Sequence, residues 1–352
     1  MTISSSSSPA RLKRLIARFR GHRIGVVGDL MLDRYLWGTA SRLSPEAAVP
    51  VVDFEGQSEC LGGAGNVAAN LAALGPRVSA FGVTGNDEAG RALQAQFRAT
   101  NIDGKGVIAD SKRTTTVKTR IIARHQQIVR VDREAREPLQ TGTEEKILRA
   151  LFTALKNLDA LVFSDYNKGL VTEAFADRVR SAADKREVPV FVGSKTSKLY
   201  AYRGSRAVTC NLKEASQFIG HALTDRKSIE DGARALLARF GCRSIVITHG
   251  PMGMYVLEEG WPHILHIPAT GFDVTYARVG QPGIERGSTG RQVFDVTGAG
   301  DTVLSVLALA VAAGANTEDA ARLANAAAGV VVGKLGTATV TPDELAHALD
   351  GH

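Results

Sequence analysis

Short apolar runs alternate with longer amphipathic stretches along most of the chain. A short apolar run bounded by turn residues is typical of a buried strand, whereas apolar positions spaced three and four apart are typical of a helix. The predicted strands are "IGVVGD", "RVSAFGVTG", "DALVFSDY", "VPVFVGSK", "AVTCN" and "SIVITHG". Helices are predicted near 172–186 and 212–240, and after the glycine turn in "LGGAGNVAANLAALG". This alternation predicts an α/β fold with a doubly wound, mostly parallel sheet and helices on both faces.

Two stretches break the alternation, at about 36–54 and 112–133. Both have an extended pattern, and the second, "TTTVKTRIIARHQQIVRVD", alternates β-branched and polar residues. The two stretches could pair as a small β-sheet lid outside the main sheet, or form edge strands of the main sheet. A lid would expose strand edges, so it also predicts a homodimer that forms through the lid.

The remaining segments divide the chain into a leader and one domain. Residues 3–8 are serine-rich and are expected to be disordered, and "RLKRLIARF" predicts a short basic helix, so that 1–21 form a leader with an N-terminal helix. Residues 22–352 are then expected to form the main domain, with a polar surface loop at 278–292.

Length and composition predict an ordinary globular protein in the cytoplasm. The chain has 352 residues, of which 44% are hydrophobic, enough for one large core. The apolar run from Val303 to Ala315 is too short to cross a bilayer, and no hydrophobic signal core follows the serines, so no membrane partner is expected. Cys60, Cys210 and Cys242 lie far apart, which favours reduced thiols.

The net charge of +7 favours an anionic partner. The basic residues are spread along the chain among acidic ones, and no basic stripe is interleaved with aromatic residues, so nucleic acid is not the expected partner. Small anions such as sugar phosphates and nucleotides fit the charge equally well.

The stretch "VFDVTGAGDTVLSVLALAVAAG" predicts an anion site. A helix that begins at a glycine turn presents unpaired N–H groups and the positive end of its dipole, so Gly298, Ala299 and Gly300 could bind a phosphate. Asp301, in the first turn, could take a proton from a substrate hydroxyl as a general base, or could simply cap the helix.

A second glycine motif, "GAGNVA" at 63–68, matches a loose dinucleotide pattern. It follows the polar "EGQSE" instead of a strand end, and the prediction of a dinucleotide-dependent oxidoreductase rests on this motif alone. Close approach of the backbone to a polyhydroxy ligand, with Asn66 as a partner, is the favoured interpretation.

Together the motifs resemble those of the ribokinase-like (phosphofructokinase-B type) sugar kinases, from about residue 22 to the C-terminus. The motifs that carry this resemblance are "GDLMLDRY", "LGGAGNVAANLAALG", "NLKE" and "DVTGAGDT". Within that family the chain is most similar to the D-glycero-β-D-manno-heptose 7-phosphate kinases, which often form the kinase half of a bifunctional kinase/adenylyltransferase. That closer match rests on "GDLMLDRYLWGTASRLSPEAAVPVV", "SDYNKG" and "ANAAAGVVVGKLGTATVTPDEL".

The resemblance implies a role for each motif residue. Asp301 would be the general base, and the anion hole would consist of Gly298, Ala299 and Gly300. The sugar hydroxyls would be held by Asp29, Asp33, Gly62, Gly63 and Asn66. ATP would contact Lys195, Asn211, Thr248, Gly250 and Gly253, with Asn325 beside the adenine or ribose. Glu214, with Asn211 nearby, would serve the Mg²⁺ ion, because a hard cation prefers oxygen ligands.

Structural alternatives remain open for several of these residues. Asn211 and Glu214 could be a helix cap and a surface acid, and Asn325 could cap its own helix. Asp33 could pair with Arg34 or a neighbour at the surface.

A sugar phosphate also needs cations, and one segment supplies several of them. The candidates are Lys118, Arg120, Arg124, Arg130 and Lys168. Even-numbered residues of a strand share one face, so the first four could form a phosphate-binding face. A solvated, charged strand is the equally weighted alternative.

One motif departs from the family pattern. Heptose kinases usually have Asp-Pro-Lys after the strand "VPVFV", whereas this chain has Gly193-Ser194-Lys195. The expected activity is ATP- and Mg²⁺-dependent phosphorylation of the anomeric hydroxyl of D-glycero-D-manno-heptose 7-phosphate, for lipopolysaccharide precursors. The alternatives are a kinase for another sugar and a catalytically silent sugar- or nucleotide-binding protein.

Overall fold

The computed structural model describes the chain except for residues 1–7, 124–125, 196–201, 270–296, 335–336 and 351–352. The serines at 4–7 and the predicted loop at 278–292 therefore lie outside the described residues. Among the described helices, none is long and apolar enough to span a membrane.

Within the described residues, nine strands form the main sheet in the order β13-β12-β11-β10-β9-β8-β1-β4-β5. Its strands are β1 (Arg23–Gly28), β4 (Arg77–Gly85), β5 (Asp103–Asp110), β8 (Ala160–Asp165), β9 (Val190–Ser194), β10 (Ala207–Asn211), β11 (Ser244–Thr248), β12 (Met254–Glu258) and β13 (Leu265–Ile267). Pairing is parallel from β11 to β5 and antiparallel only at β12 and β13. The predicted mostly parallel sheet is confirmed.

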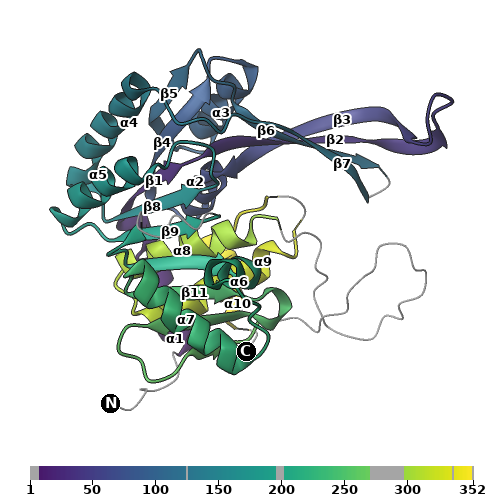
Figure 1. The fold of residues 1–352 in the computed structure, drawn as a ribbon. Coiled ribbons are helices and arrows are strands. Elements are labelled where there is room, and N and C mark those ends of the chain that lie inside the picture. Colours follow the sequence, from purple (N-terminus) through teal and green to yellow (C-terminus); the bar gives the residue numbers. More distant parts are fainter. Residues whose placement is uncertain (1–7, 124–125, 196–201, 270–296, 335–336, 351–352) are drawn as a thin grey trace, which may run out of the picture.

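Helices cover both faces of this sheet, as the sequence predicts (Figure 1). The helices are α1 (Pro9–Ala17), α2 (Ala64–Ala73), α3 (Glu88–Ala99), α4 (Thr141–Ala154), α5 (Glu173–Asp184), α6 (Leu212–Ile219), α7 (Arg226–Phe240), α8 (Ala299–Ala312), α9 (Thr317–Val331) and α10 (Pro342–Ala348). Short 3₁₀ turns lie at Phe19–Gly21, Leu155–Asn157 and Gly250–Met252.

Alternate residues of β1 enter two separate cores. Ile24 and Val26 belong to the core that also contains α1, α2, α3, α8, α9 and α10, whereas Val27 belongs to the core that contains α4, α5, α6 and α7. A strand that is buried on both faces reads as a continuous apolar run, which is why "IGVV" predicts it correctly.

The segments that break the alternation form a separate sheet in the order β3-β2-β6-β7. Its strands are β2 (Leu30–Leu43), β3 (Pro50–Gly63), β6 (Thr116–Ala123) and β7 (Gln126–Arg133). It extends away from the body as a long arm (Figure 1), so the separate sheet is confirmed and the edge-strand alternative is wrong. We call this sheet the lid. β2 and β3 are longer than the predicted 36–54, because their apolar ends continue into the core of the domain.

Two local predictions are wrong. Residues 212–240 form two helices, because Gly220 ends α6 in the left-handed region (φ 90°) and Asp225 caps the start of α7. The motif at 63–68 does follow a strand, β3, with α2 starting at Ala64. That strand pairs antiparallel with β2 in the lid, so the motif lies outside a parallel βαβ unit of the dinucleotide-binding kind.

Candidate active site

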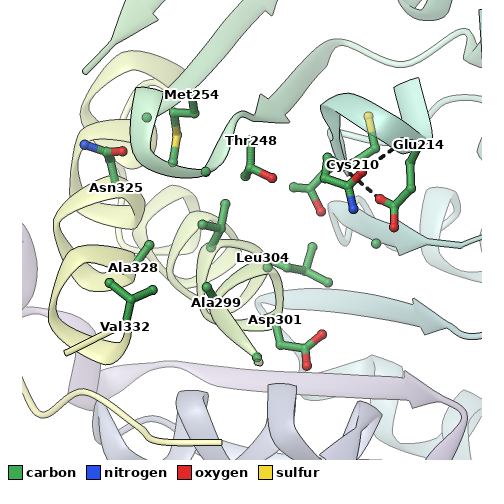
Figure 2. A pocket seen from close by; sticks show the side chains of 18 of the residues that line it. Cys210, Glu214, Thr248, Met254, Ala299, Asp301, Leu304, Asn325, Ala328 and Val332 are labelled. Atoms are coloured by element: carbon green, nitrogen blue, oxygen red, sulfur yellow. Dashed lines mark hydrogen bonds between the residues drawn. The ribbon is translucent and has the colours of Figure 1, made fainter. Parts of the chain in front are cut away.

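A cavity of about 560 Å³ lies where the carboxyl ends of β8–β11 meet the N-terminus of α8. Ligands of open α/β sheets bind at this edge, outside the carboxyl ends of the strands. Asp301 and Ala299 lie at the start of α8. Asn325, Ala328 and Val332, in α9 or directly after it, line another side of the cavity (Figure 2).

The start of α8 has the features of an anion site. Gly298 is the N-cap residue, with φ 87° and no side-chain cap, and the first helical bond runs from Thr302 N to Gly298 O. The three preceding N–H groups, of residues 299–301, therefore lie ahead of the helical hydrogen bonds at the positive end of the dipole. A Cβ atom on Gly298 would lie 2.7 Å from Asn66 Nδ2, so packing as well as φ requires glycine here.

Asp301 does not cap its helix. Its Oδ1 accepts a hydrogen bond from Tyr166 Oη (2.7 Å), and its Oδ2 accepts one from Asn66 Nδ2 (2.8 Å). Burial raises the pKa of Asp301 to about 6, and the two hydrogen bonds oppose that rise. A carboxylate with this pKa is ionised at neutral pH and is still basic enough to accept a proton, as a general base requires.

Two residues that the sequence analysis missed hold Asn66 in place. Asn70 Nδ2 donates to Asn66 Oδ1 (3.1 Å), and Thr302 Oγ1 donates to Asn70 Oδ1 (2.8 Å). The network joins α2 to α8 and fixes which way the Asn66 amide points. Its only sequence signal is the pair of asparagines four residues apart on one helix face.

On the predicted sugar side, Asp33 is buried and pairs with buried Arg120 at 2.8 Å. The alternative of a surface pair with Arg34 is wrong, because Arg34 pairs with Glu59. Gly62 and Gly63 bring the backbone of β3 close to the two aspartates. A Cβ on Gly62 would lie 2.8 Å from Asp33 Oδ2, and one on Gly63 (φ 55°) would lie 2.5 Å from Asp29 O.

Asp29 follows β1 and holds the turn after β8. Its Oδ2 accepts the backbone N–H groups of Tyr166 (2.8 Å) and Lys168 (3.0 Å). Burial and the nearby Asp165 raise the pKa of Asp29 to about 6. The role of Asp29 in holding sugar hydroxyls, which the family resemblance implies, stays a prediction.

The basic side chains that are expected to bind a phosphate are paired with acidic residues. Lys118 Nζ lies 3.0 Å from Asp132, Lys168 Nζ lies 2.6 Å from Glu134, and Arg130 also pairs with Asp132. Arg124 lies outside the described residues. Lys118, Arg120 and Lys168 do gather at the base of the lid with their counter-charges, and Asp132 and Glu134 are the partners that the sequence analysis missed.

On the predicted nucleotide side, Asn211 and Glu214 line the cavity and also form a capping box at α6. Glu214 Oε2 accepts Asn211 N–H (2.9 Å), and Glu214 Oε1 lies 2.5 Å from Lys195 Nζ. The N-cap alternative for Asn211 is therefore confirmed, whereas Glu214 is not a surface acid: it completes the capping box and its carboxylate lies at the cavity wall (Figure 2).

The rest of the nucleotide side is built from backbone and small or apolar side chains. Gly250 and Gly253 have φ of 52° and 87° and line the cavity with Thr248. Asn325, inside α9, donates to Pro268 O (2.8 Å) and does not cap the helix, which begins at the cap residue Asn316.

Gly193 and Ser194, which stand in place of the expected Asp-Pro, line the wall of the cavity. A Cβ on Gly193 would lie 2.7 Å from Leu304 Cδ2, so α8 packs into the space that a side chain would fill. Ser194 Oγ donates to the buried Asp165 (3.2 Å), which also accepts Tyr202 Oη (2.6 Å).

Curated relatives share much of the sequence. The chain is 44% identical over 335 residues to "Bifunctional protein HldE" of Geobacter metallireducens, which covers 95% of this chain and 64% of the relative. It is 45% identical over 324 residues to the protein of the same name from Geobacter sulfurreducens, covering 92% and 62%. The chain thus spans less than two thirds of the length of these relatives.

Solved structures share the fold at low sequence identity. Arabidopsis thaliana ribokinase, complexed with ribose and ATP, superposes with a TM-score of 0.70 at 18% identity, over 93% of this chain and 98% of that one. Escherichia coli phosphofructokinase-2, in complex with substrates and products, gives 0.72 at 18% identity, over 94% and 98%. Both likenesses confirm a ribokinase-like fold.

A family match covers nearly the whole domain and agrees with the geometry of Asp301 at the start of α8. Residues 22–344 match the pfkB family of carbohydrate kinases. The oxidoreductase interpretation of residues 63–68 is therefore wrong. The chain belongs to the pfkB family of carbohydrate kinases.

Proposed function

We propose that the protein phosphorylates the anomeric hydroxyl of D-glycero-D-manno-heptose 7-phosphate, giving the 1,7-bisphosphate and ADP for lipopolysaccharide precursor synthesis. The observation that carries the chemistry is the Asp301 carboxylate, held by Tyr166 and Asn66 beside the open N-terminus of α8. The sugar is inferred from the heptose-kinase motifs and is supported by the extensive identity to the HldE proteins.

In the proposed reaction, Asp301 takes the proton of the anomeric hydroxyl as that oxygen attacks the γ-phosphate. The N–H groups at the start of α8 stabilise the negative charge that develops on the transferring phosphoryl group. Asp29, Asp33 and Asn66 are proposed to orient the sugar hydroxyls. Lys118 and Lys168, at the base of the lid, are proposed to hold the 7-phosphate.

The nucleotide side fits Mg²⁺-ATP. Among the described residues, no group of three or more histidine, cysteine, aspartate or glutamate side chains is placed to hold a metal ion. Mg²⁺ needs no such cage, because it keeps waters and binds through one or two carboxylates together with substrate phosphates. Glu214, whose carboxylate lies at the cavity wall, would hold it. The ion would neutralise phosphate charge.

The lid is proposed to close over the sugar and to exclude water from the phosphoryl group. We also propose that two copies associate through it. Apolar side chains are exposed on the lid, among them Leu43, Phe54, Val129 and Val131. Burying them against a second copy would remove apolar surface from water.

The three thiols of Cys60, Cys210 and Cys242 are free, and we place the protein in the reducing cytoplasm.

The substrate assignment is tested by measuring ADP release across a panel of sugars and sugar phosphates with Mg²⁺ and ATP. We expect turnover on heptose 7-phosphate, with ³¹P NMR showing a new anomeric phosphate. Turnover on another sugar would move the substrate and keep the mechanism. ATP binding without turnover on any member would favour a silent binding protein.

A further inference from the structure

The turn after β8, residues 166–169, is tied to three other parts of the molecule. Asp29 accepts the N–H groups of Tyr166 and Lys168. Arg113 donates to the carbonyl of Lys168, and Lys168 Nζ pairs with Glu134 beyond β7. The turn is therefore held from β1 and from the base of the lid at once.

From this fixed turn, the Tyr166 side chain lines the cavity and reaches Asp301. Its hydroxyl donates to Asp301 Oδ1 at 2.7 Å, while Asn66 holds the other carboxylate oxygen. The ring lies 5.7 Å from Lys195 Nζ, in a cation–π contact. The two donors come from different elements and bracket the carboxylate, so they restrict its rotation.

We propose that Tyr166 is a positioning residue for Asp301, whose hydroxyl fixes the orientation of the base and favours its ionised form. The proposal rests on the proposed function, in which Asp301 takes the proton. A hydrogen bond to a charged acceptor is stronger than one between neutral groups, so a carboxylate gains more from this donor than a protonated carboxyl does.

The charges around the pair agree with this role. Burial and the neighbouring Asp301 raise the pKa of Tyr166 well above its usual value, with smaller contributions from Asp33 and Glu214, so the hydroxyl keeps its proton and can donate. Asp301 faces Lys195, which favours its ionised form, and Asp33, which opposes it. Removing the Tyr166 hydroxyl leaves these charges in place.

The test compares Tyr166→Phe with a matched control, Tyr202→Phe. The first variant keeps the ring over which Lys195 lies and removes only the hydroxyl. The second removes a buried hydroxyl that donates at 2.6 Å to another carboxylate, that of Asp165. The rate constant kcat/KM for the sugar substrate is measured against pH for both variants and for the wild type.

We expect the acid limb of the Tyr166→Phe profile to shift to higher pH by about one unit, because losing a donor to the ionised form raises the pKa of the base. On the plateau, kcat should fall by about ten-fold through lost orientation, with KM for ATP within about two-fold of wild type. Tyr202→Phe should lower the thermal midpoint and leave the acid limb unmoved. The proposal would be overturned if the acid limb of Tyr166→Phe coincided with that of the wild type, or if the acid limb of Tyr202→Phe shifted as far as that of Tyr166→Phe.

A second readout needs no turnover. In protein labelled with ¹³C at the aspartate carboxyls, the Asp301 resonance is assigned by its loss in Asp301→Asn and titrated with pH. We expect its midpoint to rise by about one unit in Tyr166→Phe. If this midpoint rises while no sugar is phosphorylated, the proposed function is wrong and the proposal that Tyr166 positions Asp301 is supported. If sugar is phosphorylated and neither readout moves, the proposal about Tyr166 is wrong.

Discussion

The proposed sugar side, at the base of the lid, and the proposed nucleotide side, in the cavity beside α8, are built in different ways. On the sugar side, charged side chains are paired with one another: Arg120 with Asp33, Lys118 with Asp132, and Lys168 with Glu134. The cavity of the nucleotide side is lined mainly by glycine backbone and apolar side chains.

Selectivity can arise from this difference. In the proposed binding of a sugar phosphate, the phosphate replaces the acidic partners of the lid cations, so a ligand that cannot replace them leaves a charge unpaired. In the proposed nucleotide site, the backbone has already set the shape before a nucleotide binds, as at Gly250 and Gly253. Binding on the two sides should therefore respond differently to mutation.

The largest expected effect on stability is on the sugar side. Asp33→Ala removes the counter-charge of buried Arg120 and should lower the free energy of unfolding by about 3 kcal/mol. Asn325→Ala, on the nucleotide side, removes one hydrogen bond to a backbone carbonyl and should cost about 1 kcal/mol. Urea unfolding measures both, and equal losses would contradict the contrast between the two sides.

A smaller effect is expected on substrate affinity. Glu134→Gln removes the charge that pairs with Lys168 and lies 3.9 Å from Lys118, so both ammonium groups become more available to a phosphate. The KM for heptose 7-phosphate should fall by about three-fold, in line with the modest strength of such pairs, and KM for ATP should not change. Steady-state kinetics at fixed ionic strength measures both constants. A rise in the sugar KM would mean that Glu134 positions the lysines for binding.

Much of the fold could be predicted because its signals are local. The run Ile24–Val27 is buried on both faces, and the glycine turn before α8 precedes a helix of small apolar residues. The split between α6 and α7 was also encoded locally, by Gly220 and Asp225, but an amphipathic pattern that continued past them hid it.

The contacts that complete the site depend on topology. Tyr166 and Asp301 are 135 residues apart, and they meet only because β8 ends beside the start of α8. The ion pair between Lys118 and Asp132 follows from the register of β6 with β7, in which these two residues are partners. Neither the strand order nor the register can be read from residue spacing alone.

The most direct test of the central claim, that Asp301 is the base of a sugar kinase, is Asp301→Asn. The substitution keeps the size of the side chain and removes the basic carboxylate. We predict that sugar-dependent ADP release falls by about 10³-fold, while the Kd for ATP measured by calorimetry stays within about two-fold of wild type. Turnover within ten-fold of wild type would contradict the assignment of Asp301 as the base.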